Sequence, residues 1–278
     1  LEQAVAALVA GDQQHPFAVL GPHPAGKGQV VRTLQPFAAE VRLLYEGGEI
    51  PLQRRHPAGL FEAAVPPGLS EYRLAVTDDR QHRWEVKDPY AFRIRLPEQE
   101  LERFSSGVHD RAYRLFGAHP LTIEGTPGVR FAVWAPHARR VSVVGDFNRW
   151  DGCHHPMEHD AGHGTWTLFI PGLTAGDLYK YEIKTPGGDV CTKADPFGTY
   201  AEVRPATASV IWETAHHTWH DEDWMRRRAA WQPLEEPLSI YEVHAGSWRR
   251  RDGSGFLSYR ELAETLVPYV REGGFTHI

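Results

Sequence analysis

One pattern of residues occurs twice within the first 214 positions of this 278-residue chain. The pattern has three blocks. A Pro-x-Ala-x-x-Val motif recurs after 100 positions, and an aromatic residue followed four positions later by an apolar residue recurs after 105 positions. A block that contains a tyrosine and then an Asp-Pro-aromatic tripeptide recurs after 107 positions. The matched pairs are Pro36 and Pro136, Val41 and Val141, Phe61 and Trp166, Val65 and Ile170, Tyr72 and Tyr179, Val76 and Ile183, and Asp88 and Asp195. Because order and spacing agree in three blocks, the pattern indicates an internal duplication.

Each copy shows the alternation that is typical of strands with one buried face. In the second copy apolar side chains alternate at 129–133, 166–170 and 179–183, and a closing strand is expected at 208–213. The alternation places Lys180, Glu182 and Lys184 on a face that we expect to be solvated. About seven antiparallel strands in roughly 100 residues is the size of an immunoglobulin-like sandwich. We predict a mainly β fold that begins with two tandem immunoglobulin-like β-sandwiches.

The pattern changes after position 214. Residues 215–237 are charged, contain several tryptophans and end in prolines, which predicts a linker. A strand is expected at 238–244. Ser258 and Glu261 form a capping box for a helix that should end at Gly273. Residues 275–278 resemble a second strand. Strand, helix, strand is the beginning of a parallel α/β fold. One such unit cannot close a core, so we expect the chain to stop inside a domain.

Composition excludes several classes of protein. With 30 basic and 36 acidic residues the formal charge is −6, which argues against a nucleic-acid partner. The sequence contains no apolar run of 18 residues, so no membrane partner is expected. Cys153 and Cys191 are too few for a disulfide framework, and two free thiols in a cytoplasmic protein are favoured, although one bridge between them is also possible.

Three further clusters favour structural explanations. The spacing of the histidine and aspartate group at 216–223 suits neither a zinc pair nor a calcium loop, and Gly21 to Gly28 lacks the spacing of a phosphate-binding loop. Glu242 and His244 share one side of the expected strand at 238–244, where packing is a better explanation than acid–base chemistry. We therefore predict no metal site and no cofactor. The histidines and aspartates of the first cluster are His216, His217, His220, Asp221 and Asp223.

Several segments resemble bacterial 1,4-α-glucan (glycogen) branching enzymes. YEVHAGSW at 241–248, SYRELAETLVPYV and GGFTHI resemble the first strand, first helix and second strand of their (β/α)8 TIM barrel. GVRFAVWAPHARRVSVVGDFNRWDG resembles their carbohydrate-binding-type sandwich, and HPFAVLGPH, HPAGLFE and WEVKDPY resemble their extra N-terminal sandwich. The resemblance implies a domain order of 1–112 (N-terminal sandwich with a short leading helix), 113–214 (carbohydrate-binding-type sandwich), 215–237 (linker) and 238–278 (start of the barrel).

The resemblance implies a glycosyltransferase of glycogen biosynthesis. Such enzymes cut α-1,4 glucan and rejoin the freed chain as an α-1,6 branch, through a retaining double displacement by carboxyl groups of the barrel. Those carboxyl groups lie beyond the second barrel strand, so the resemblance assigns no catalytic residue to this chain. We expect the 278 residues alone to be inactive, and the barrel to pack on the sandwiches. A debranching or trehalohydrolase-type enzyme and a non-catalytic glucan-binding module are the alternatives.

The resemblance also suggests where α-1,4-glucan or glycogen would bind. Related modules use two tryptophans and a lysine, since sugars present flat C–H faces and rings of hydroxyl groups. Trp150 and Lys180 match two of these positions, and Asn148 lies in the same segment as Trp150. Cys191 occupies the position of the second tryptophan, whereas the first repeat has Trp84 there. The competing interpretation is that Trp150 packs its own loop or docks on the barrel.

Overall fold

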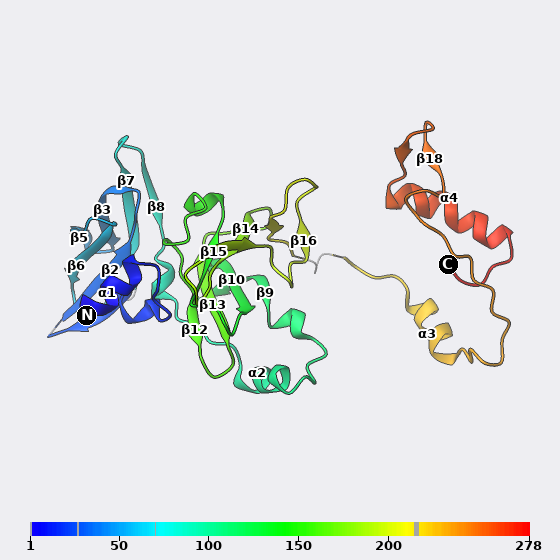
Figure 1. Cartoon of the computed structure of the whole chain (residues 1–278), viewed down its shortest axis with the longest axis horizontal. Coiled ribbons are helices and arrows are strands. Elements are labelled where there is room, and N and C mark those ends of the chain that lie inside the picture. The colour runs from blue at the N-terminus through cyan, green and yellow to red at the C-terminus, as the bar shows by residue number, and fades with distance from the viewer. Residues whose placement is uncertain (1, 27, 70, 214–216) are drawn as a thin grey trace. The chain divides into compact units, whose positions relative to one another are not determined.

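The computed structural model describes residues 2–26, 28–69, 71–213 and 217–278. The chain forms two compact units, Leu1–His216 and His217–Ile278. The first unit contains two β-sandwiches, drawn from blue to yellow-green in Figure 1. This architecture confirms the predicted mainly β fold with tandem sandwiches. The expected boundary at 214/215 lies outside the described residues.

The first sandwich consists of two four-stranded antiparallel sheets. One sheet has, in spatial order, β1 (Gly21–Ala25), β2 (Gly28–Leu34), β6 (Leu60–Val65) and β5 (Gln53–His56). The other has β4 (Gly48–Pro51), β3 (Ala38–Tyr45), β7 (Arg73–Asp78) and β8 (Arg83–Val86). Val31 and Phe61 from the first sheet pack with Val41, Leu43 and Leu74 from the second to form the core.

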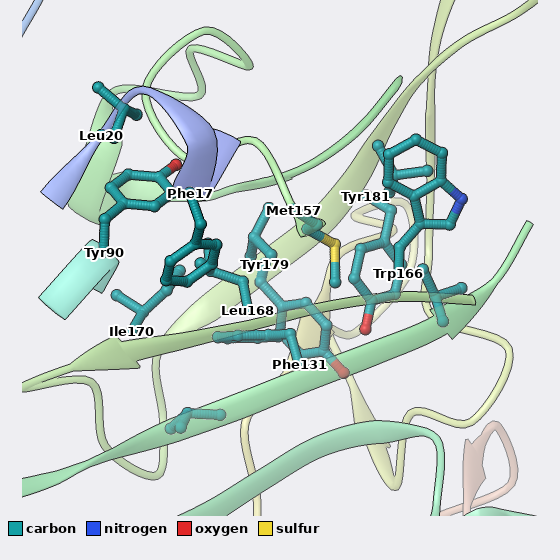
Figure 2. Close-up of a cluster of buried hydrophobic side chains, with 14 of the residues drawn as sticks. Phe17, Leu20, Tyr90, Phe131, Met157, Trp166, Leu168, Ile170, Tyr179 and Tyr181 are labelled. Carbon is teal, nitrogen blue, oxygen red and sulfur yellow. The ribbon is translucent and has the colours of Figure 1, made fainter. Parts of the chain in front are cut away.

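The second sandwich consists of a four-stranded and a five-stranded sheet and has a larger core. One sheet has the order β12 (Glu158–Asp160), β13 (Thr165–Pro171), β10 (Thr126–Trp134) and β9 (Gly117–Ile123). In the other sheet, β14 (Leu178–Lys184) pairs with three strands: β11 (Arg140–Val144), β15 (Val190–Lys193) and β17 (Ser209–Val210). The strand β17 also pairs with β16 (Tyr200–Ala201). The closing strand is thus limited to 209–210, shorter than the predicted 208–213. Figure 2 shows the aromatic core, in which Phe131, Trp166, Tyr179 and Tyr181 are buried.

Strand pairing confirms the duplication at the level of single residues. The order β1-β2-β6-β5 of the first copy corresponds to β9-β10-β13-β12 of the second, and β3-β7-β8 corresponds to β11-β14-β15. Val76 lies opposite Trp84 in the β7–β8 ladder, and Ile183 lies opposite Cys191 in the β14–β15 ladder. Trp84 and Cys191 therefore occupy equivalent positions, as the offset of 107 predicts.

A buried tyrosine–aspartate hydrogen bond is repeated in both sandwiches. Tyr72 Oη donates to Asp88 Oδ2 at 2.7 Å, and Tyr179 Oη donates to Asp195 Oδ2 at 2.7 Å. The other oxygen of each carboxylate accepts a backbone N–H two residues on, from Tyr90 at 3.0 Å and from Phe197 at 2.8 Å. Each aspartate thereby ties a central strand to the segment that comes after the β8 or β15 hairpin strand. At Asp88 this segment is the short 3-10 helix η2 (Pro89–Ala91).

The N-terminal segment packs on the second sandwich. It consists of α1 (Glu2–Val9) and the 3-10 helix η1 (Pro16–Ala18), whose Leu8 and Phe17 enter the same core as Phe131. Tyr90, from the end of the first sandwich, joins them (Figure 2) and donates from Oη to the Pro156 carbonyl at 3.0 Å. One continuous core therefore holds the two sandwiches together.

The same segment covers a face that was expected to be solvated. Lys184 Nζ lies 2.5 Å from Asp12 Oδ1, and Glu182 pairs with the buried Arg140 guanidinium. Asp12 also binds Arg139, at 2.9 Å. The prediction of a solvated face at Glu182 and Lys184 is therefore wrong. Lys184 is paired with Asp12, which comes from a distant part of the sequence, and Glu182 is paired with Arg140 of the neighbouring strand β11.

The remaining helices of this unit connect its parts. The helix α2 (Glu98–Ser105) and the 3-10 helix η3 (Ala112–Arg114) link the two sandwiches, and Leu101 packs with Leu115 and Phe116 in a small core. The 3-10 helix η4 (Asp146–Asn148) comes after β11.

The unit His217–Ile278 contains α3 (Glu222–Ala230), the hairpin of β18 (Arg250–Arg251) and β19 (Gly255–Phe256), and α4 (Tyr259–Glu272). The capping box of Ser258 and Glu261 is present, and the C-cap of α4 is Gly273, as predicted. The strands expected at 238–244 and 275–278 are reduced to one parallel bridge between Ile240 and His277. The predicted strand–helix–strand order is retained, but an isolated parallel pair lacks the neighbours that stabilise such strands.

Burial of Asp88 makes the stability of the first sandwich depend on pH. Burial raises the pKa of this carboxyl from 3.8 to about 6, although the hydrogen bonds from Tyr72 and the Tyr90 backbone oppose the rise. Since the folded-state pKa is raised, the stability contribution of Asp88 is complete below pH 4 and is lost as the pH rises through 6. The variant Asp88→Asn does not show this pH dependence, because asparagine has the shape of the protonated carboxyl group but does not titrate.

We expect the free energy of unfolding of the wild type, relative to Asp88→Asn, to fall by roughly 2–3 kcal/mol between pH 4 and pH 7. Urea unfolding at several pH values measures this difference. The control is Asp79→Asn, at an exposed position of the β7–β8 turn. A difference between wild type and Asp88→Asn that stays constant with pH would contradict the expectation.

Candidate functional site

The loop that carries Trp150 begins at Gly145, directly after β11 ends at Val144. A Cβ at this position would lie 2.2 Å from the carbonyl oxygen of Leu178, so the close approach of β14 requires glycine. The 3-10 helix η4 starts directly after it. The loop therefore leaves the sheet at a fixed point and in a fixed direction.

Asn148, the only asparagine of the chain, holds this loop closed. Its Oδ1 accepts the Gly145 N–H at 2.9 Å, and its Nδ2 donates to the Val143 carbonyl at 2.8 Å. The Nδ2 atom also lies 2.9 Å from Nδ1 of His155. Burial, with a smaller contribution from His154, lowers the pKa of His155 well below its usual value, so the ring is neutral and its Nδ1 can accept. At 1% exposure, Asn148 shapes the loop and presents no free polar atom to a ligand.

Trp150 is held in place from within its own loop. Its indole Nε1 donates to Asp146 Oδ1 at 2.8 Å. Arg149 and Trp150 both have left-handed backbone angles, with φ of 57° and 59°. The side chain remains 37% exposed, so part of the ring is available to a ligand. The loop of Trp150 thus holds the indole N–H, while part of the ring is open to solvent.

Lys180 lies near the root of the same loop. It is opposite Val144 in the β11–β14 ladder, one residue before Gly145. Its Nζ donates to Oγ1 of Thr207 at 2.7 Å, and the side chain is partly exposed. Neither Asp146, which anchors Trp150, nor Thr207 was identified from the sequence, because both depend on loop closure.

Trp84 lies in the first sandwich, on the edge strand β8. It is half-buried and stacks on His82, with 5.5 Å between ring centroids and 28° between planes. Trp84 and Asn148 line one cavity of about 670 Å³, together with other residues of β8 and of the Trp150 loop. Trp150 and Lys180 are not among the residues that line it. The candidate residues therefore fall on two surfaces joined by the loop 146–150.

The other clusters have local structural contacts. Gly21–Ala25 forms strand β1, which pairs with β2 from Gly28 onward, and Nδ1 of His244 lies 2.8 Å from Ser247 Oγ. Cys153 and Cys191 are both free. Among the residues that the structure describes, no group of three or more His, Cys, Asp or Glu side chains could hold a metal ion, and His216 lies outside them. None of the described helices has the length and apolarity needed to cross a membrane.

Comparison with known proteins places the chain in a family. The family described as "Carbohydrate-binding module 48 (Isoamylase N-terminal domain)" matches residues 115–198, and "alpha-1,4-glucan branching enzyme GlgB, N-terminal domain" matches residues 1–90. The 1,4-alpha-glucan branching enzyme GlgB of Rubrobacter xylanophilus is 49% identical over 100% of this chain and 38% of its own length. The chain belongs to the GlgB branching-enzyme family. GlgB proteins of Gloeobacter violaceus and Cereibacter sphaeroides are both 48% identical, over 99% and 100% of this chain.

The chain spans about 38% of the length of these GlgB relatives. Within this part, the candidate residues divide between the two matched families. Trp84 lies in the range matched by the GlgB N-terminal domain, whereas Asn148, Trp150 and Lys180 lie in the range matched by carbohydrate-binding module 48. The cavity that contains Trp84 is lined by residues of both matched ranges, whereas Trp150 and Lys180 lie in the range of carbohydrate-binding module 48 alone.

Replacing Asn148 by alanine tests its role in holding the loop. Asn148→Ala leaves the Gly145 N–H and the Val143 carbonyl without their buried partner, so we expect a loss of about 1–3 kcal/mol in the free energy of unfolding. Urea denaturation measures the loss. Asn148→Asp keeps the acceptor but places a buried carboxylate oxygen against the Val143 carbonyl and His155 Nδ1, so it should destabilise at least as much as alanine. If both variants unfolded like the wild type, the loop would not depend on this side chain.

Proposed function

We propose that this chain is the N-terminal part of a 1,4-α-glucan branching enzyme of glycogen biosynthesis. The observation that carries the proposal is 48–49% identity to named branching enzymes over 99–100% of the chain. The reaction cuts an α-1,4 chain and re-attaches it as an α-1,6 branch, with carboxyl groups of the barrel performing a retaining double displacement. We assign none of these carboxyl groups to residues 1–278.

In this proposal the sandwiches hold and position long glucan chains in the cytoplasm. Trp150 offers a flat apolar surface for the C–H face of a glucose unit, and Lys180 offers a donor for hydroxyl groups. Asn148 acts indirectly, by shaping the loop. Trp84 would serve as an aromatic surface in the first sandwich.

The proposed division of the chain is an N-terminal sandwich at 1–112, a glucan-binding sandwich at 113–214, a linker at 215–237 and the start of a TIM barrel at 238–278. The parallel bridge between Ile240 and His277, with α4 between them in the sequence, supports the last assignment. We propose that the completed barrel packs on the sandwiches and acts on the glucan that they hold.

Affinity electrophoresis in gels containing glycogen tests the glucan contact. We expect glycogen to retard the chain, and expect Trp150→Ala and Lys180→Ala to weaken retardation, with about a tenfold loss of affinity for the tryptophan variant. Trp134→Ala is the matched control, since Trp134 is an exposed tryptophan of the same sandwich. Equal retardation of wild type and Trp150→Ala would remove Trp150 from the site.

An assay of branching tests the reaction itself. The complete reading frame that contains this segment should lower the iodine absorbance of amylose and create α-1,6 linkages without a net gain of reducing ends. The 278 residues alone should be inactive. Release of linear chains from branched glucan with new reducing ends would identify a debranching enzyme instead. Activity of the 278 residues alone would refute the assignment of the catalytic carboxyl groups to barrel residues outside this chain.

A further inference from the structure

The cavity that contains Trp84 is a groove between the two sandwiches. The first sandwich contributes the edge strand β8 with its preceding turn, and the second contributes the loop 146–149 and the turn after β13. We call this cavity the inter-sandwich groove; its volume of about 670 Å³ lies within the range of ligand-binding sites. Its lining includes the charged and aromatic side chains Arg73, His82, Trp84, Asp146, Phe147 and Arg149.

The duplication relates this groove to the surface proposed for the second sandwich. Trp84 is equivalent to Cys191, and Arg73 precedes Lys180 by the same 107 positions. The first sandwich therefore has a basic residue and a tryptophan where the second has a basic residue and a cysteine. The aromatic residue that the second copy lacks is present in the first, where the loop of Trp150 faces it across the groove.

The charges of the groove favour an uncharged ligand. Arg73 is paired with Glu85 at 3.3 Å, and Arg149 is paired with Asp78 at 3.5 Å. The guanidinium of Arg149 also lies 4.6 Å from the centre of the Phe37 ring. Asp146 adds a further carboxylate to the lining. Lys87, which donates to Oγ1 of Thr126 at 2.5 Å, is a third cation of the lining, beside the carboxylates of Glu85 and Asp146. Charges of both signs are thus mixed and give no strong field for a polyanion. They do provide donors and acceptors for hydroxyl groups.

The aromatic side chains supply the second requirement of a sugar site. Trp84 of the edge strand stacks on His82, the residue before that strand, with 28° between the ring planes, and Phe147 lines the opposite side. A flat ring beside hydrogen-bonding groups suits the C–H face and hydroxyl rim of a glucose unit. We propose that the inter-sandwich groove binds a short segment of α-1,4-glucan, with Trp84 against a sugar face and Arg149 and Asp146 toward its hydroxyl groups.

This inference rests on the proposed function, since it takes α-glucan as the ligand, but it names a second site. Asp146 connects the two sites, because it lines the groove and also accepts the indole N–H of Trp150. A glucan bound in the groove would therefore contact the carboxylate that orients Trp150. The two sandwiches together, and not the second one alone, would form the glucan-binding surface.

Titration of the 278-residue chain with maltoheptaose, followed by the tryptophan indole N–H signals in ¹⁵N NMR spectra, tests the groove directly. The signal of Trp84 is assigned as the one that is absent from the spectrum of the Trp84→Phe variant. We expect it to shift saturably with maltoheptaose in the wild type and also in Trp150→Ala, and not with the β-linked cellohexaose. His82→Ala, at an exposed position, should weaken the affinity measured at Trp84 by about threefold to tenfold.

The outcomes separate the two proposals. A Trp150 signal that shifts while the Trp84 signal does not would overturn the groove and leave the proposed function in place. If neither signal moved, and glycogen did not retard the wild type, both proposals would fall. A Trp84 shift that disappears in Trp150→Ala would also overturn the groove as a site of its own. Trp134→Ala, whose tryptophan does not line the groove, should titrate like the wild type.

Discussion

The buried hydrogen bond between a tyrosine and an aspartate supports the connection between the two sandwiches. In the first sandwich, Tyr72 holds the carboxylate of Asp88, and Asp88 fixes the start of η2 through the Tyr90 backbone. Tyr90 then reaches the second sandwich, where its hydroxyl binds the Pro156 carbonyl beside His155. Since His155 contacts Asn148, a continuous series of contacts leads from the first sandwich to the loop of Trp150. The groove between the sandwiches depends on this series.

The parts of the fold that could be predicted are those fixed by short-range pattern or by register. The offset of 107 between the repeats is correct down to single ladder pairs, because a shift of one residue would move Tyr179 or Tyr72 out of the core. The α4 helix is correct because Ser258 and Glu261 cap it locally. The alternation along 179–184 suggested that Lys184 faces solvent, but its partner Asp12 lies 172 positions earlier, and no local pattern encodes that contact.

The residues of the candidate site also divide into those that could be identified from the sequence and those whose function depends on tertiary contacts. Trp150 and Lys180 could be singled out through the family resemblance and Trp84 through its repeat position, whereas the function of Asn148 could not. Its three hydrogen-bonding contacts, with Gly145, Val143 and His155, exist only after the loop closes. Likewise, Arg73 and Arg149 face one cavity only because the second sandwich packs against the first. Residue type identifies the aromatic candidates, and tertiary structure decides which surface each one serves.

The left-handed backbone at Arg149 and Trp150 has a consequence for binding. Two successive residues with φ of 57° and 59° are disfavoured by about 1–2 kcal/mol each, and the fold offsets this cost through Asn148 and Asp146. The ring is consequently immobilised when the protein folds, before any sugar arrives. A glucan that bound Trp150 as proposed would not have to order this ring, so the entropy cost of binding would lie mainly in the glucan's own conformational, translational and rotational freedom.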